Sequence, residues 1–154
     1  NEDTQNKILN DLEFLSEISS INVIPSRRTP SEFIKNLSML KNHNIKIFTD
    51  LFDPVTYGNL LSESNMQIVT WDSISMISEA ISSETGTFLY EFEEESCPKR
   101  YRLFHQMVKQ KGFLKNFSRN MKPYTISMSS YNSELKSKIL NKIESNLWFK
   151  NSVS

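Results

Sequence analysis

Apolar residues recur at intervals of three and four along most of this chain, a spacing that places them on one face of an α-helix. In residues 4–18, for example, Ile8, Leu12 and Leu15 share a face, and Thr4 stands where a helix cap belongs. The pattern predicts helices over residues 4–18, 30–43, 53–61, 73–81, 99–117 (interrupted at Gly112) and 134–148.

Short apolar or alternating runs lie between these segments and predict β-strands. They are INVI (21–24), IKIF (45–48), MQIVTW (66–71), TFLYEFE (87–93) and PYTISM (123–128). Strands that alternate with helices are typical of a three-layer α/β fold. We therefore predict a mostly parallel sheet of about five strands with helices on both faces. Residues 87–93 alternate like a half-buried or edge strand, so a mixed sheet is the alternative.

The length of 154 residues suits one domain with its own core, and no interior stretch resembles a linker. We expect residues 1–154 to form a single domain, excised from a larger protein because both ends read as arbitrary. The apolar runs are too short for a transmembrane helix. A lone cysteine, Cys97, excludes an internal disulfide and fits a reducing, intracellular compartment.

The formal net charge of zero hides a strong separation of charge along the chain. Residues 1–98 carry a net charge of −10 and residues 99–154 a net charge of +10. A basic segment interleaved with aromatic residues suits phosphate contact and base stacking, or an acidic protein partner. The alternative is that these cations are simply solvated beside a buried helix face. The candidate binding residues are Lys99, Arg100, Arg102, Lys109, Lys111, Lys115, Arg119 and Lys122.

The motifs of several enzyme classes are missing from the sequence. It has no glycine-rich dinucleotide loop, no P-loop, no GxSxG elbow, no CxxC and no HExxH. The two histidines, His43 and His105, are expected in surface or packing roles. We therefore expect no catalytic residue, no cofactor and no enzymatic activity.

Three carboxylates follow predicted strands, where ligands bind in parallel α/β folds. Asp50 and Asp53 follow residues 45–48, and Asp72 follows residues 66–71. Such a group would suit Mg²⁺ or Mn²⁺ and phosphodiester hydrolysis. However, Asp53 and Asp72 also stand at helix N-cap positions, so we expect no bound metal and retain these three as weak candidates.

The order of elements, with Asp50 and Asp72 at some strand ends, resembles a degenerate PIN-like domain. The INVIPS segment lacks the acid that a PIN nuclease carries, which implies a pseudo-nuclease. The abundance of serine and asparagine and the single alanine are similar to the α/β domains of TASOR-type chromatin-silencing scaffolds. BRCT-like and helicase second-lobe folds fit the first 85 residues nearly as well.

These observations favour a non-catalytic scaffold domain of an intracellular, nuclear protein that takes part in transcriptional silencing. It would bind protein partners, with nucleic acid as a further partner and without membrane association. Trp148 and Phe149 close the last predicted helix and are candidate interface residues. The alternative is a nucleic-acid-binding or metal-dependent nuclease-like domain that uses the basic segment.

Overall fold

The computed structural model describes residues 2–40, 42–49, 53–92 and 97–128, with positions 137 and 141. The chain divides into two compact units, residues 1–60 (unit 1) and 61–154 (unit 2). Helices alternate with strands in both units, and every pair of named strands is parallel, so the predicted α/β class is confirmed. The strands form a two-stranded and a three-stranded sheet rather than one sheet of about five. The expectation of a single domain stays a prediction.

Unit 1 contains a short parallel sheet accompanied by helices. Strands β1 and β2 pair in the register Ile21 opposite Ile45, and Leu15 and Leu37 are buried. The predicted helix over residues 30–43 ends early, and Asn42 and Asn44 then form a polar turn before β2. The elements are α1 (Glu2–Ser16), β1 (Ile21–Val23), α2 (Ser31–Ser38), β2 (Ile45–Ile47) and the first part of α3 (Pro54–Glu63).

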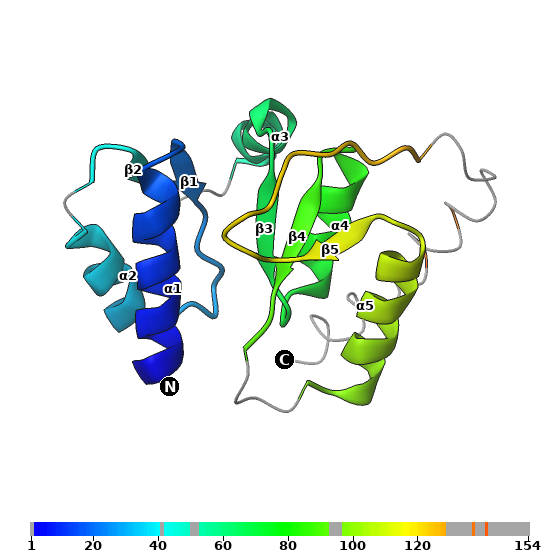
Figure 1. Ribbon diagram of the computed structural model, residues 1–154, viewed down its shortest axis with the longest axis horizontal. Coiled ribbons are helices and arrows are strands. Elements are labelled where there is room, and N and C mark those ends of the chain that lie inside the picture. Colours follow the sequence, from blue (N-terminus) through cyan, green and yellow to red (C-terminus); the bar gives the residue numbers. More distant parts are fainter. Residues whose placement is uncertain are drawn as a thin grey trace. The chain divides into compact units, whose positions relative to one another are not determined.

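Unit 2 is built on a parallel sheet with the strand order β3–β4–β5, and Figure 1 shows β4 in the middle. All residues of β4 are buried, because the strand has a neighbour on each side and helices pack on the sheet. The expectation of an edge strand over residues 87–93 was therefore wrong. The named elements are β3 (Gln67–Thr70), α4 (Ile74–Ser82), β4 (Thr87–Tyr90), α5 (Lys99–Gln110) and β5 (Leu114–Asn116).

The end of α5 differs from the helix predicted over residues 99–117. The helix ends at Gln110, and Gly112 has a positive φ of 76°, a conformation that glycine adopts without strain. The chain then reverses, and Leu114 pairs with Thr87 of β4. The apolar residues after Gly112 were misread as a continuing helix face because a short buried run fits either element.

The strand predicted over residues 123–128 does not form. Within this segment Thr125 makes an isolated antiparallel bridge with Thr85. The segment is nevertheless fixed to the sheet by Tyr124, whose hydroxyl oxygen lies 2.6 Å from the Thr87 carbonyl oxygen and 3.1 Å from that of Phe113. The helix predicted over residues 134–148, and with it Trp148 and Phe149, lies outside the described residues except at positions 137 and 141.

The core of unit 2 lies between the sheet and its helices. Apolar side chains from the strands, from α4 and from α5 form one buried cluster, and Ile126 and Met128 close it from the segment after β5. This cluster fixes the ends of β3 and β4 against α5. Its largest fully buried members are Ile77, Leu89, Leu114 and Val108.

Candidate functional site

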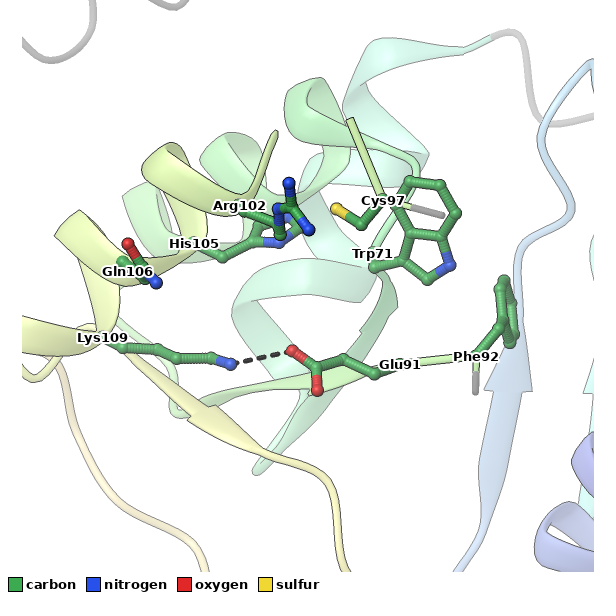
Figure 2. Close-up of a pocket in the computed structure, with 8 residues that line it drawn as sticks. All are labelled: Trp71, Glu91, Phe92, Cys97, Arg102, His105, Gln106 and Lys109. Carbon is green, nitrogen blue, oxygen red and sulfur yellow. Dashed lines mark hydrogen bonds and ion pairs between the residues drawn. The ribbon is translucent and has the colours of Figure 1, made fainter. Parts of the chain in front are cut away.

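A pocket of about 270 Å³ opens in unit 2 where β3 and β4 end. Trp71 follows β3 directly, and Glu91 and Phe92 follow β4. The carboxyl ends of parallel strands meet at one edge of a sheet, which is where α/β proteins bind ligands. The other wall comes from α5 and the residue before Pro98, as Figure 2 shows. Those residues are Cys97, Arg102, His105, Gln106 and Lys109.

The lining residues of α5 form a single stripe. Positions 102, 105, 106 and 109 have the spacing that brings helical side chains to one face. The adjacent stripe, which contains Phe104 and Val108, is buried in the core. Packing of the apolar stripe against the sheet therefore turns the polar stripe toward the strand ends.

Aromatic rings form the apolar part of the pocket. The ring of Trp71 meets that of Phe92 edge to face at 6.3 Å and that of Tyr101 at 6.1 Å. Trp71 is 8% exposed, and its indole nitrogen has no hydrogen-bond partner among the described residues. In Figure 2 this nitrogen lies on the side of Phe92. The rings thus provide a rigid apolar surface beside polar groups.

Among the described residues that line the pocket, positive charges outnumber negative ones. Nζ of Lys109 lies 2.9 Å from Oε1 of Glu91, so these two charges offset each other. Arg102 is exposed, and no described acidic residue forms an ion pair with it. The first turn of α5 has no side-chain cap, and a helix N-terminus favours negative charge. The described lining residues therefore favour an anion.

His105 is the most deeply buried polar group of the pocket, with 4% of its surface exposed. Burial lowers the pKa of His105, and the positive charge of Lys109 lowers it further. A hydrogen bond to the Trp71 backbone and the charge of Glu91 act in the opposite direction. Burial has the largest effect, so the imidazole is neutral at neutral pH.

Cys97 lies beside these groups, and Figure 2 shows its sulfur directed toward Arg102. Burial raises the pKa of the Cys97 thiol, although the charge of Arg102 opposes this effect. The thiol is therefore protonated at neutral pH, and a thiol is a much weaker nucleophile than a thiolate.

The predicted basic residues have different surroundings. Arg102 and Lys109 line the pocket. Arg100 stacks over the ring of Tyr101 at 5.0 Å, and Lys115 lies 4.0 Å from the ring centre of Tyr124. Their role in binding nucleic acid or an acidic partner stays a prediction, as it does for Lys99, Lys111, Arg119 and Lys122.

Neither Asp53 nor Asp72, the two predicted carboxylates that the structure describes, lines the pocket. Asp53 caps α3, accepting hydrogen bonds from the backbone N–H of Val55 and the hydroxyl of Thr56, and these bonds lower its pKa. Asp72 lies in the turn after Trp71 and is not a lining residue. Asp50 lies outside the described residues. Among residues that are described, no three acidic, histidine or cysteine side chains gather in a way that would hold a metal.

Sequence reasoning missed several residues of the pocket. Trp71 and Glu91 were placed inside the predicted strands 66–71 and 87–93, whereas β3 and β4 end one residue before them. Only the aspartates were therefore considered as residues that follow a strand. The polar stripe of α5 was also present in the sequence as a spacing of three and four. The residues around His105 in the sequence do not predict its burial, because burial of a polar residue depends on what packs over it.

The described part of the chain is an α/β protein with a pocket at the carboxyl ends of two parallel strands. Residues 1–139 match the model of the family described as Mitochondrial fission ELM1, and the chain belongs to this family. No curated protein and no solved structure matches it significantly. In the part of the chain that the structure describes, no helix is long and apolar enough to cross a membrane.

The family match corrects the interpretation drawn from the sequence. The resemblance to a PIN-like domain of TASOR-type scaffolds was wrong, and so was the nuclear location in chromatin silencing. The predicted function as a nuclear silencing scaffold was wrong as well, whereas the alternative of a nucleic-acid-binding or nuclease-like domain stays untested. The resemblance rested on element order and composition, which unrelated α/β proteins share.

Proposed function

We propose that this chain acts in mitochondrial fission, in association with mitochondria, and that it does so by binding a small anion in the strand-end pocket. The family description supports the first part. The second part rests on one observation: Arg102 stands at the carboxyl ends of β3 and β4 without a described acidic partner, beside a pocket of small-molecule size.

The charge distribution of α5 supports an anionic ligand. The helix carries cations and no acidic residue, and its N-terminus contributes a partial positive charge. Lys109 is engaged by Glu91, so Arg102 is the cation that remains to meet a ligand. Its guanidinium matches a carboxylate or phosphate with two parallel hydrogen bonds.

The shape of the pocket limits the size of the ligand. A volume of about 270 Å³ lies just below the usual range for small-molecule sites. The ring of Trp71 offers an apolar surface to the uncharged part of the ligand. We therefore expect a small organic anion rather than a long chain.

We further propose that the pocket binds its ligand without reacting with it. The thiol of Cys97 is the strongest potential nucleophile in the pocket, and its raised pKa keeps it protonated. A binding role agrees with a site in which the one described carboxylate, Glu91, is paired with Lys109 and the guanidinium of Arg102 is left as a donor. Ligand occupancy would then control the activity of the protein in fission.

The test compares two arginines of the same helix. Titration calorimetry with acetate, glycolate and inorganic phosphate is carried out on the wild-type protein, Arg102→Gln and Arg100→Gln. Loss of a charge-assisted contact is expected to weaken binding about tenfold or more in Arg102→Gln. Arg100→Gln removes the same charge from a residue outside the pocket lining, so its affinity should stay within about twofold of wild type.

The link to fission needs a cellular measurement. Mitochondrial length is compared in cells that lack the protein and receive wild type, Arg102→Gln or Arg100→Gln. We expect Arg102→Gln to leave mitochondria elongated and Arg100→Gln to restore them. Equal weakening by both variants, or the absence of anion binding in the wild type, would contradict the proposed site.

A further inference from the structure

The ion pair between Lys109 and Glu91 joins the two walls of the pocket. Lys109 comes from α5 and Glu91 follows β4 directly, and both residues line the pocket. Nζ of Lys109 lies 2.9 Å from Oε1 of Glu91, and Figure 2 draws this contact as a dashed line. The side chain of Lys109 is 27% exposed and that of Glu91 is 54% exposed, so both ends of the pair meet solvent.

The fold of unit 2 does not depend on this pair. An ion pair that solvent reaches changes an equilibrium by no more than about fivefold. Helix α5 is held in the core by Phe104 and Val108, which are 9% and 1% exposed, whether or not the pair forms. Glu91 can therefore turn away from Lys109 into water at little cost, and its departure leaves an unpaired cation at the pocket wall.

Glu91 marks a position in which a carboxylate is bound. It is the one carboxylate among the described lining residues, and it lies in a pocket that also contains two cations. A ligand carboxylate has the same charge and geometry as that of Glu91, so it can take the same position and accept the same hydrogen bond from Lys109. Glu91 thus competes with such a ligand for Lys109.

The spacing of Arg102 and Lys109 sets the number of charges that a ligand can use. Lys109 follows Arg102 by seven residues, which is close to two full turns and about 10 Å along the helix axis, so both side chains leave the same face of α5. A ligand with one anionic group that is held by Arg102 leaves Lys109 to Glu91. A ligand with a second anionic group can contact both cations, and once Arg102 holds the first group, the second competes with Glu91 from within the same complex.

We infer that the pocket binds dianions whose two charged groups are separated by several bonds, with Arg102 holding one group and Lys109 the other, and that Glu91 occupies Lys109 until such a ligand displaces it. Dicarboxylates and phosphorylated carboxylic acids share this chemistry. The inference rests on the proposed function, because it names the ligand class of the same site.

The test compares adipate with adipamate, in which an uncharged amide of nearly the same size replaces one carboxylate. Titration calorimetry at neutral pH and constant ionic strength measures both affinities, and their ratio reports the contact with the second charge. We expect the wild type to bind adipate about fivefold or more tightly than adipamate, since a charge-assisted contact outweighs the loss of an exposed ion pair.

Two substitutions in the pocket should change this preference in opposite directions. Lys109→Gln removes the second cation, so adipate and adipamate should bind within about twofold of each other. Glu91→Gln keeps the size of the side chain but removes the competing charge, so the preference for adipate should rise by about two- to fivefold.

Lys99→Gln and Glu79→Gln are the matched controls. They remove the same charges from exposed positions of unit 2 that lie outside the pocket lining. Both should keep the wild-type preference within about 1.5-fold, because solvent and salt screen charges at such positions. None of the four replaced side chains is buried, so the variants should keep the fold, which circular dichroism checks.

The outcomes separate the two proposals. If Arg102→Gln weakens both ligands but the wild type binds them equally, the selectivity for dianions is refuted and the anion site stands. A preference that survives in Lys109→Gln, or that Lys99→Gln lowers to the same extent, would overturn the role of Lys109. If Glu91→Gln leaves the preference unchanged or lowers it, Glu91 is not the competitor. If neither ligand binds, the proposed function itself fails, and the inference fails with it.

Discussion

Removal of the Tyr124 hydroxyl should destabilise unit 2 far more than removal of a tyrosine hydroxyl that lies on the surface of the unit. The Tyr124 oxygen accepts a hydrogen bond from the backbone N–H of Thr87 at 3.0 Å and lies within hydrogen-bond distance of the carbonyl oxygens of Thr87 and Phe113. It thereby ties β4 to the residue before β5. Tyr124→Phe deletes these bonds but keeps the ring contacts with Phe88 and Lys115.

The magnitude follows from the burial of Thr87, which is fully enclosed. Its N–H would lose its partner at a place that water does not reach, and an unsatisfied buried donor costs about 1–3 kcal/mol. With the two carbonyl groups added, we expect Tyr124→Phe to lower the free energy of unfolding by about 2–3 kcal/mol. Tyr101→Phe is the matched control, because its hydroxyl has a single long contact with Arg100, and it should cost less than about 0.5 kcal/mol.

Urea unfolding followed by tryptophan fluorescence measures this difference. Both tryptophans, Trp71 and Trp148, belong to unit 2, so the signal reports on the unit that contains the change. The midpoint should fall by about 1 M at an unchanged slope. A loss no larger than that of Tyr101→Phe would refute the reasoning, since it would mean that Thr87 finds another partner.

The same hydroxyl gives a second readout in alkali. Burial raises the pKa of Tyr124, so the folded state holds this proton more tightly than the unfolded state. The corresponding stability is present below the unfolded pKa of about 10 and is lost as the pH rises through the folded value. Tyr124→Phe should lack this part of the alkaline decline, whereas Tyr101→Phe should retain it.

Further predictions concern a glycine and the buried histidine. A Cβ at Gly86 would lie 2.4 Å from the backbone oxygen of Tyr124, so Gly86→Ala should cost about 2 kcal/mol or more in urea unfolding. Gly58→Ala, in a helix with open space around it, should instead stabilise by about 0.4–1 kcal/mol. The lowered pKa of His105 means that its contribution to stability is present above the unfolded pKa of about 6.5 and is lost as the pH falls through the folded value. Thermal melting between pH 7 and 5 should show this decline in the wild type and not in His105→Asn.

Much of the fold could be predicted from the sequence, because the apolar spacing and the turn residues that define a helix or strand lie within that element or next to it. Strands β1, β2 and β3 and helices α1 to α4 follow from apolar spacing and from turn residues such as Pro25 and Asn42. The α/β class follows from their alternation. The place of the pocket was only partly readable: the carboxyl edge of a parallel sheet is known to bind ligands, but the predicted strand over residues 66–71 included Trp71, which follows β3 in the structure.

The errors lie where the answer depended on a distant partner. A buried apolar run has the same sequence at the edge of a sheet as in its middle, so β4 was misplaced and β5 was read as helix. Thr87 pairs with Leu114, which follows the turn at Gly112, and its N–H donates to the hydroxyl of Tyr124, and neither partner is near Thr87 in the sequence.

The sequence by itself determined helices α1 to α4, the start of α5 with its cations, strands β1 to β4 and the α/β class. The tertiary structure alone decided the order of β3, β4 and β5, the pairing of Lys109 with Glu91 and the burial of His105. The physical reason is that periodicity reports which face of an element is apolar, whereas pKa, charge pairing and strand order depend on what packs against that face. Those neighbours lie far away along the chain, and folding brings them together.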